Sequence, residues 1–420
     1  MSLQNKISVD ISAINPLTKE YNYATITLPA TPMEIEDAFQ KARVTKGGEY
    51  FVEIISSPKV PKLGEVYIDG EKNIVELNLL AKKLSLLDDD QMTVFNALFE
   101  NSIDDEMMAP SLEELINMTD GLGKMILIHG ITTDEQLGEF VIDNNLSEVL
   151  ETASDDVLEY VSTKIVGQKF REMENGVFYN GSYIPLGAYE KQYGYKSPSK
   201  EQLEVKNHYA FALNIAEAPV NDSEETADSA EWIFLPADKE YINGIAKIHN
   251  EACIEDCVFY DFKSVFKCID SQVFGDMQDF DKLNEIAQRY VRLDDANRIK
   301  FKAVVEKVQP QTLDEVLEIS DNLNRYEHSY YSVSEADFAM EYLARQLPTN
   351  FDMNAFDKRE VRNFGERIIM GMEATVTDYG IVSAKDQRLY ETITATKNEQ
   401  EEEYQNEIET QDEGYGGMTM

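Results

Sequence analysis

Apolar and polar positions alternate near the start of the chain and again just after its midpoint. Ile7, Val9 and Ile11 occupy every second position, and residues 209–215 show the same alternation. A period of two places these side chains on one face of a strand. We therefore predict a half-buried strand in each of the two regions.

Further strand signals follow in both regions. A second strand is expected to end at Leu28, and its counterpart at Leu235. Another strand is predicted over residues 50–56, with a counterpart over residues 258–264. The two regions therefore predict the same set of strands.

A short helix is predicted after the second strand. Thr31 is a suitable N-cap, and Pro32 fits the first helical position, where a backbone N–H is not needed. Glu34, Glu36 and Asp37 follow, and acids are favourable in the first turn of a helix.

The middle of the first half has the period of helices. Leu77, Leu80 and Leu84 share one helical face, and residues 92–99 repeat this spacing. Residues 87–90, Leu-Asp-Asp-Asp, separate the two helices and place acids at the next helix N-terminus. Later segments predict three more helices and a closing strand: helices at 112–118, 134–144 and 155–171, and a strand at 177–184.

The most informative pattern is an internal repeat. Leu28-Pro29-Ala30 recurs 207 positions later as Leu235-Pro236-Ala237, and Leu77-Asn78 recurs 206 positions later as Leu283-Asn284. Further matches keep the same order over about 170 residues while the offset falls slowly, as small loop deletions would cause. We therefore interpret the chain as two copies of one module.

This interpretation predicts the fold class and the domain boundaries. Strands and helices are segregated within each copy, which is typical of an α+β fold. Glycine and proline residues between the copies predict a connector. A C-terminal segment rich in acidic residues and without basic residues after Lys397 predicts a disordered tail. The predicted segments are a first module at 1–184, a linker at 185–206, a second module at 207–384 and an acidic tail at 385–420.

The net charge limits the choice of partner. The chain has 79 acidic and 38 basic residues, a formal net charge of −41. Nucleic acids and anionic membranes would be repelled, because both are bound through Lys and Arg. A basic macromolecule is the expected partner.

Two features predict a soluble cytoplasmic protein. The first residues have no basic region followed by an apolar segment, so no signal peptide is expected. Three cysteines in 420 residues do not form a disulfide framework.

Motifs for catalysis are missing from the sequence. It has no G-x-S-x-G elbow, no phosphate-binding loop and no H-E-x-x-H motif. Residues 120–124, Asp-Gly-Leu-Gly-Lys, have the wrong glycine spacing for such a loop and predict a turn from helix to strand. We expect neither an enzyme nor a cofactor.

One cluster has the residue types of a zinc site. His249, Cys253, Cys257 and Cys268 lie within twenty residues. The spacing of the first two cysteines is unusual for zinc, and the aligned first copy has aromatic residues near this place. Buried free thiols explain the cysteines as well, and we predict no metal. The single tryptophan, Trp232, is expected to be a packing residue.

Three explanations of the acidic charge are open. The acids could form an ordinary solvated surface, an adaptation to salt, or an imitation of DNA. The many apolar residues and the 38 basic residues fit salt adaptation poorly. Acids three or four positions apart on a helix are about 5–6 Å from each other, near the spacing of phosphates. Because like charges so placed destabilise a fold, a protein that keeps many of them uses them.

The motifs of both halves, taken in order, resemble the ArdA-type antirestriction proteins. The resemblance covers residues 5–184 and 207–383, most of the chain. In the first half it is carried by Leu28-Pro29-Ala30-Thr31-Pro32, Glu76-Leu77-Asn78, Leu87-Asp88-Asp89, Val166-Gly167-Gln168-Lys169 and Gly181-Ser182-Tyr183, and in the second half by Trp232-Ile233-Phe234-Leu235, Leu283-Asn284, Phe364-Gly365-Glu366-Arg367 and Gly380.

The resemblance implies a function and a partner. Members of this family are DNA mimics that occupy the DNA-binding groove of type I restriction–modification enzymes in bacterial cells. Each module is then expected to contain small antiparallel sheets flanking a helical bundle, in an elongated body. Family members usually carry one module and form dimers, so this chain would be an intramolecular pseudo-dimer or a homodimer.

The hypothesis assigns the DNA-like surface to acids on exposed faces of both halves. The predicted residues are Glu34, Glu36, Asp37, Asp88, Asp89, Asp90, Glu113, Glu114, Asp134, Glu135, Glu139, Asp155, Asp156, Glu159, Asp294, Asp295, Asp314, Glu315, Asp321 and Glu335. The alternative function is that of an acidic inhibitor or adaptor of another basic nucleic-acid-binding protein, such as an anti-CRISPR-like inhibitor, another anti-defence protein or a histone-like chaperone.

Overall fold

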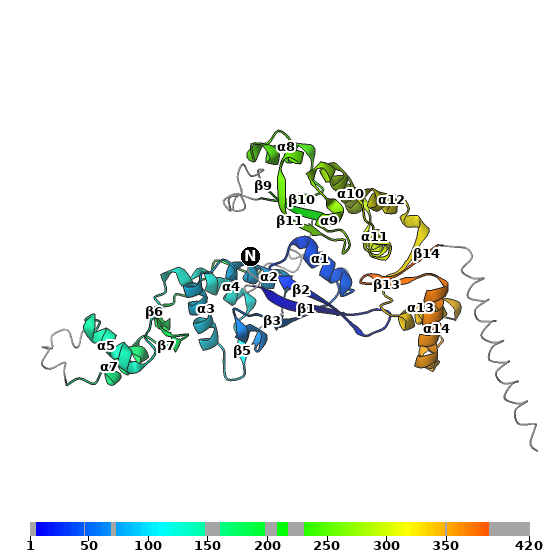
Figure 1. Ribbon diagram of the computed structural model, residues 1–420. Coiled ribbons are helices and arrows are strands. Elements are labelled where there is room, and N and C mark those ends of the chain that lie inside the picture. The colour runs from blue at the N-terminus through cyan, green and yellow to red at the C-terminus, as the bar shows by residue number, and fades with distance from the viewer. Residues whose placement is uncertain are drawn as a thin grey trace, which may run out of the picture. The chain divides into compact units, whose positions relative to one another are not determined.

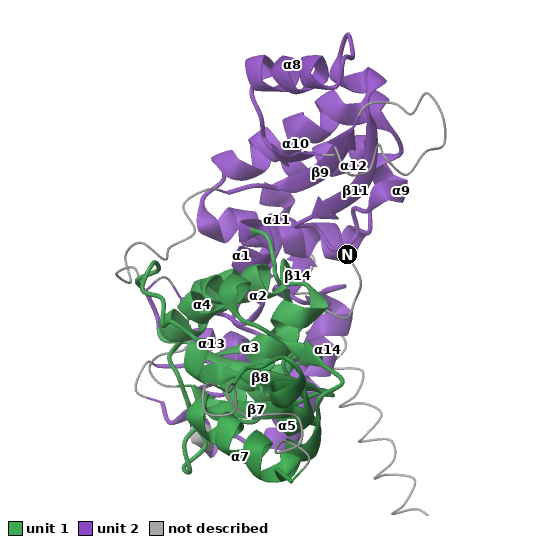
Figure 2. Cartoon of the chain, turned by 90° about the vertical axis from the view of Figure 1, so that its left-hand side faces the viewer, with its two compact units in different colours: residues 1–12, 23–31, 49–205 green, residues 13–22, 32–48, 206–420 purple. Residues whose placement is uncertain are grey.

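The structure is a computed structural model with two compact units (Figure 2). It describes residues 6–45, 47–68, 73–147, 160–197, 208–216, 231–348 and 351–385. Unit 1 comprises residues 1–12, 23–31 and 49–205, and unit 2 comprises residues 13–22, 32–48 and 206–420. The units do not follow the order of the chain, and the predicted boundaries at 184 and 207 stay a prediction.

The first sheet belongs mainly to unit 1 and has the strand order β2-β1-β3. Its strands are β1 (Ile7–Ile14), β2 (Tyr21–Leu28) and β3 (Phe51–Ser56). Every second residue of β1 and β2 is buried, so the predicted alternation is confirmed.

A group of helices follows in unit 1 (Figure 1). Asp88 lies between the first two of them and caps the second, as predicted. Leu77, Leu80 and Phe95 are fully buried, which confirms the predicted apolar faces. The elements are β4 (Tyr67–Ile68), α2 (Ile74–Leu84), α3 (Asp89–Asn101), β5 (Met108–Ala109) and α4 (Leu112–Asp120), and β4 pairs with β5 in parallel.

Unit 1 ends in a small sheet with two helices. The strands have the order β6-β8-β7, and the helices cross at Gly138 and Gly167, where an added Cβ would lie 1.8 and 1.9 Å from a backbone oxygen of the other helix. Leu137, Val141 and Tyr183 form a separate apolar core. The elements are β6 (Ile128–His129), α5 (Asp134–Asp143), α7 (Thr163–Met173), β7 (Gly176–Tyr179) and β8 (Ser182–Pro185).

Two predictions about this region are wrong. The closing strand predicted over 177–184 is a hairpin, because Asn180 and Gly181 both have positive φ and form its turn. The helix predicted over 155–171 begins only at Thr163 within the described residues, since residues 160–162 are not helical.

Unit 2 contains a sheet with the order β10-β9-β11. Its strands are β9 (Phe211–Ala216), β10 (Glu231–Leu235) and β11 (Val258–Ser264). All residues of β9 except Asn214 are buried, so both faces of this strand are covered. The half-buried strand predicted here is therefore a fully buried one, and its core continues through Phe266, Phe274 and Phe301.

Helices pack on this sheet and on each other. Asp294 caps α11 just as Asp88 caps α3 in unit 1. The elements are α8 (Lys239–Ile248), α9 (Ser271–Phe274), α10 (Phe280–Arg292), α11 (Asp295–Val308) and α12 (Leu313–Asp321).

Unit 2 also ends in a small sheet with two helices. The strand order is β12-β14-β13, and Gly365 lies where an added Cβ would be 2.1 Å from the backbone oxygen of Glu335. The elements are β12 (Tyr326–Ser329), α13 (Glu335–Gln346), α14 (Lys358–Gly371), β13 (Thr375–Thr377) and β14 (Gly380–Ala384).

The N-terminal helix α1 (Pro32–Lys41) is part of unit 2. Pro32 is its first residue, as predicted. Met33 packs in the main apolar core of unit 2, with Phe211 and Phe301. Every residue from 33 to 41 is buried or half-buried, so α1 is covered on all sides.

Corresponding turns in the two halves are held by the same hydrogen bonds. In unit 1 the Ala30 N–H donates to Oδ1 of Asn78 (2.7 Å), whose Nδ2 donates to the Ala30 carbonyl (2.9 Å). In unit 2 Ala237 and Asn284 make the same pair of bonds at 2.9 and 3.0 Å. The chain contains both helices and strands, with several small antiparallel sheets, and this part of the expected fold is confirmed.

Residues 185–197 of the predicted linker belong to unit 1. Tyr195 N–H donates to Asn117 Oδ1 (2.7 Å), and Ser197 N–H donates to a carboxylate oxygen of Glu113 (2.8 Å). Residues 198–207 and the tail after residue 385 lie outside the described residues. None of the helices described combines the length and the apolar character that a membrane span needs.

Candidate functional site

Carboxylates gather at the N-termini of two helices in unit 1. Asp88 caps α3 by accepting from Gln91 N–H (2.8 Å), and Asp89 and Asp90 occupy the first turn. All three acids are exposed. Glu113 and Glu114 occupy the first turn of α4, where both are half-buried.

The same arrangement occurs in unit 2. Asp294 caps α11 by accepting from Asn297 N–H (2.8 Å), and Asp295 follows it. Asp314 and Glu315 occupy the first turn of α12. All four acids are exposed.

The helix ends compensate part of the repulsion between these acids. A helix N-terminus carries about half a positive charge and has N–H groups without partners inside the helix. Acids placed there are stabilised locally while their outer oxygens face solvent. The fold can therefore hold anionic groups at fixed positions at little cost in stability.

Acidic residues also lie in the first turn of α5, which pairs with α7, and of α13, which pairs with α14. Asp134, in the first turn of α5, accepts two hydrogen bonds from Arg171 (2.8 and 3.3 Å) and is partly buried. Glu135 and Glu139 on the same helix are exposed, as predicted. Glu335 begins α13 in unit 2 and is half-buried.

Basic residues neutralise some of the exposed acids. Lys59 lies 3.1 Å from Asp89, and Lys282 lies 3.0 Å from Asp314. Arg289 lies 2.6 Å from Asp321. Because these acids keep 94%, 70% and 66% of their side-chain surface exposed, the pairs contribute little to stability and leave the carboxylates accessible.

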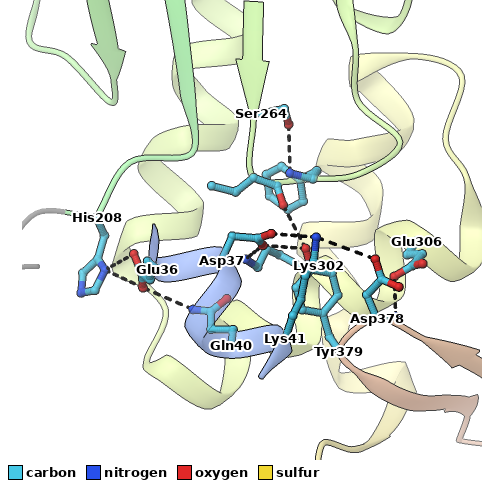
Figure 3. Close-up of polar contacts among 12 residues, drawn as sticks. Glu36, Asp37, Gln40, Lys41, His208, Ser264, Lys302, Glu306, Asp378 and Tyr379 are labelled. Atoms are coloured by element: carbon cyan, nitrogen blue, oxygen red, sulfur yellow. Dashed lines mark hydrogen bonds and ion pairs between the residues drawn. The ribbon is translucent and has the colours of Figure 1, made fainter. Parts of the chain in front are cut away.

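The prediction of an exposed surface is wrong for Glu36 and Asp37 of α1, whose side chains are 16% and 17% exposed, whereas Glu34 keeps 36% of its side chain exposed. Glu34 pairs with Lys263 at 3.1 Å, and Glu36 with His208 at 2.9 Å. All three face partners within unit 2, and Figure 3 shows the contacts of Glu36 and Asp37.

Asp37 is the centre of a buried polar network in unit 2. It forms an ion pair with Lys302, which has 1% of its side chain exposed, and another with Lys41 at 2.7 Å. Tyr379 donates its hydroxyl hydrogen to the Asp37 carboxylate (2.6 Å). Burial raises the pKa of Asp37, but the charges of Lys302 and Lys41 outweigh this and leave it below its ordinary value.

Arg43, just after α1, also attaches this helix to the rest of unit 2. Its side chain is buried and donates to the carbonyls of Tyr330 (2.9 Å), Asp378 (2.7 Å) and Lys41 (2.7 Å). A guanidinium that binds backbone carbonyls fixes position without needing a carboxylate partner. The network therefore anchors α1 in unit 2.

The sequence contained a signal for this network that motif reasoning missed. Arg298, Phe301, Lys302 and Val305 are buried at helical spacing on α11. A lysine in an apolar stripe requires a buried acidic partner. Its partner, Asp37, lies 265 positions earlier, so one sequence cannot identify it.

Other exposed acids lie outside the predicted set. Asp104, Asp105 and Glu106 follow one another in the loop after α3. In unit 2, Asp270 caps α9 and Asp276 caps the next short helical turn. An Asp directly before a helical segment is a readable N-cap signal. Asp155, Asp156 and Glu159, which were predicted, lie outside the described residues.

One serine, histidine and aspartate lie in a row in unit 1. Ser182 Oγ is 3.2 Å from His129 Nδ1, and His129 Nε2 is 3.4 Å from Asp90. Ser182 is 3% exposed, whereas the histidine and the aspartate are exposed. A nucleophile must reach its substrate, and in a catalytic triad the acid rather than the serine is the buried member. Because the serine is buried and the aspartate is exposed, we interpret these contacts as structural rather than catalytic.

The candidate zinc ligands do not form a site. Cys253 donates to Asp256 (3.1 Å), and this hydrogen bond raises the pKa of its thiol to about 11. Burial raises the pKa of Cys257 to about 11 as well. Among the described residues no three His, Cys, Asp or Glu side chains are grouped to hold a metal ion.

The turn predicted at residues 120–124 is confirmed. Asp120 ends α4, residues 122–124 form one short helical turn, and β6 begins at Ile128.

No family model matches the chain, and no curated protein matches it.

Proposed function

We propose that the chain is a DNA mimic that blocks the DNA-binding groove of a type I restriction–modification enzyme. The observation that carries the proposal is the fixed, repeated placement of exposed carboxylates at helix N-termini. Asp88 and Asp294 cap α3 and α11 and are exposed, and the first turn of α12 carries exposed acids where that of α4 carries half-buried ones. A basic groove would meet these groups at set positions, as it meets phosphates.

The proposal includes two copies of one module. Three features support it: the shared strand orders, the matched hydrogen bonds of Asn78 and Asn284, and the matched caps Asp88 and Asp294. All of them agree with the offsets found in the sequence. Each half also has a small sheet with a pair of helices. The helices cross at Gly167 in the first half and at Gly365 in the second, which fits the same interpretation.

Electrostatics support a protein partner rather than a small molecule. A net charge of −41 steers a basic partner toward the chain. Carboxylates held at helix ends need no reorganisation on binding. The proposed activity needs no reactive group.

Neutralising a cluster of helix-terminal acids tests the proposal. The variant carries Asp88→Asn, Asp89→Asn and Asp90→Asn, since Asn at the first position still caps the helix. Inhibition of DNA cleavage should weaken stepwise as substitutions accumulate, because each exposed charge contributes only about 0.2–1 kcal/mol. Single changes should be nearly silent.

A matched control separates position from net charge. Glu172→Gln, Glu366→Gln and Glu373→Gln remove the same charge from exposed acids that are not in the first turn of a helix. The control should inhibit almost as well as the original chain. If cluster and control variants weaken inhibition equally, placement has no role; if one substitution abolishes inhibition, a hot-spot adaptor replaces the mimic.

A further inference from the structure

Residues 189–197 of unit 1 form neither helix nor strand and lie against α4, and we name them the strap. Asn117 on α4 holds the strap by its backbone. The Asn117 side chain accepts from the Tyr195 N–H (2.7 Å) and donates to the Tyr195 carbonyl (2.9 Å). Asn117 itself is 4% exposed, so this attachment is shielded from water.

The strap also contacts three carboxylates, those of Glu76, Glu113 and Glu114. Lys191 forms an ion pair with Glu114 (2.5 Å). The Tyr195 hydroxyl donates to Glu76 (3.1 Å), and a backbone N–H of the strap donates to Glu113 (2.8 Å). Lys191 is the one basic residue of the strap that pairs with them. Three carboxylates therefore face a single ammonium group.

Gly121 at the end of α4 is explained by the strap. Its φ is −88°, which residues with a side chain also adopt, so the backbone does not require glycine there. An added Cβ, however, would lie 2.6 Å from the ring of Tyr189 in the strap. The glycine therefore permits the close approach of the strap to the helix.

The positions that receive the strap have different residues in the second half. α4 and α12 have the same length and begin 201 positions apart, and the helices before them match at an offset of 206. At these offsets the counterparts of Glu76, Asn117 and Gly121 are Lys282, Glu318 and Asn322. All three residues that fit the strap have changed, so the surface that receives it is specific to unit 1.

The strap makes the acids of the two halves unequal. Glu113 and Glu114 are half-buried in unit 1, whereas Asp314 and Glu315, their counterparts in unit 2, are exposed. The residues that follow β14 lie outside the described residues. Within the part that the structure describes, the first turn of α12 is open to a ligand and that of α4 is covered.

The strap is held by contacts that a ligand can replace. None of residues 189–197 is buried, so the strap adds no side chain to a core. Lys191 and Glu114 keep 53% and 40% of their side chains exposed, and such ion pairs contribute little to stability. Segments with few buried apolar contacts open at a low free-energy cost. A ligand with several positive charges would also satisfy the carboxylates better than one lysine does.

We infer that the strap is an autoinhibitory cover, which keeps Glu113 and Glu114 from a basic ligand until that ligand displaces Lys191. The inference rests on the proposed function for the class of ligand, a basic macromolecule. It gives the two halves different roles in binding. The acids of α12 are available at the first encounter, and those of α4 become available when the strap opens.

Binding of a fluorescent oligolysine peptide to the full chain tests the inference. Asp314→Asn with Glu315→Gln should weaken binding about two- to fivefold, as expected for exposed charges. Glu113→Gln with Glu114→Gln should change it very little, because the strap already occupies these acids. Equal effects of the two pairs in the original chain would overturn the inference.

An open-strap variant should make the covered acids count. Asn117→Ala removes both bonds to the strap backbone, and Gly121→Ala places a methyl group against Tyr189 without a change of charge. In this background, substitution of Glu113 and Glu114 should weaken peptide binding as much as substitution of the α12 acids does. If these acids stay silent in the open variant, the strap does not cover a binding surface.

The matched control is Asn144→Ala with Gly123→Ala. Asn144 donates to the carbonyl four positions earlier (2.8 Å), as Asn117 also does (2.9 Å), but makes no bond to the strap. A Cβ at Gly123 would meet no atom within 4 Å. In the control background Glu113 and Glu114 should remain without effect.

Hydrogen exchange of the original chain gives a readout that needs no variant. The amides of Tyr195 and Ser197 donate to Asn117 and Glu113, so saturating oligolysine should make both exchange faster, and an uncharged peptide should not. Exchange that oligolysine leaves unchanged would overturn the inference. These experiments use no restriction enzyme, so a failure of the proposed inhibition would leave their results unchanged.

Discussion

Lys302 shows how a single buried charge organises unit 2. It is fully buried on α11, and its ammonium group lies 4.7 Å from the ring centre of Tyr379 while it pairs with Asp37. Burial lowers the pKa of Lys302, and the Asp37 carboxylate opposes this effect. Removal of either partner would leave the other charged and buried.

We predict a large loss of stability from Asp37→Asn. An uncompensated buried charge costs about 3–5 kcal/mol, whereas an apolar replacement of both partners costs far less. Asp37→Leu combined with Lys302→Met should therefore recover most of the loss. Urea unfolding followed by the fluorescence of Trp232, the only tryptophan, measures unit 2 directly. Equal losses in the single and double variants would contradict the account.

His328 makes unit 2 sensitive to acid. Burial lowers its pKa from 6.5 to about 4, and its Nε2–H donates to the carbonyl of Tyr379 (2.8 Å). The unfolded chain therefore binds a proton at a higher pH than the folded chain. The stability linked to this group is complete above pH 6.5 and is lost as the pH falls toward 4.

We predict that His328→Gln reduces this loss. The neutral amide keeps an N–H donor for Tyr379 and cannot take up a proton. Between pH 6.5 and 4 the original chain should lose about 3 kcal/mol more unfolding free energy than the variant. Urea titrations at several pH values measure the difference, and parallel pH profiles would exclude this role of His328.

At the scale of elements, helix pairs depend on close contact at glycine. α5 and α7 cross where Gly138 lies against Thr163 and Gly167 against Asp134. α13 and α14 cross at Gly365 in the same way. A side chain at any of these positions would separate the helices.

We predict that Gly167→Ala loosens the end of unit 1. Its new methyl group would lie 1.9 Å from the Asp134 carbonyl oxygen, and such overpacking typically costs about 1–3 kcal/mol. Hydrogen exchange of the α5 and α7 amides should become faster. Gly123→Ala is the control, because a Cβ there meets no atom within 4 Å. Unchanged protection in Gly167→Ala would mean that the crossing does not require glycine.

The elements also show what the sequence reveals and what it hides. The alternation in β1 and the caps Asp88 and Asp294 follow from local rules, so they were predictable. The Asn180-Gly181 turn was equally local, but the apolar residues around it gave the appearance of one strand. The burial of Asp37 depends on residues more than 260 positions away, which no local pattern can reveal.

At the scale of the whole molecule, the proposed function depends on carboxylates that the fold holds at fixed positions. The exposed carboxylates are tied to helix N-termini in both units, while the acids of α1 anchor that helix inside unit 2. Fixed, exposed charges should make binding fast and sensitive to salt, because exposed charges are screened beyond about 10 Å at 0.1 M salt.

Competition between this chain and duplex DNA for a type I restriction–modification enzyme tests the central claim most directly. The account predicts mutually exclusive binding, with duplex DNA displacing the chain from the enzyme and an affinity that falls steeply as salt is raised. Simultaneous binding of DNA and the chain to the enzyme would contradict mimicry, and an affinity that does not change with salt would contradict its electrostatic basis.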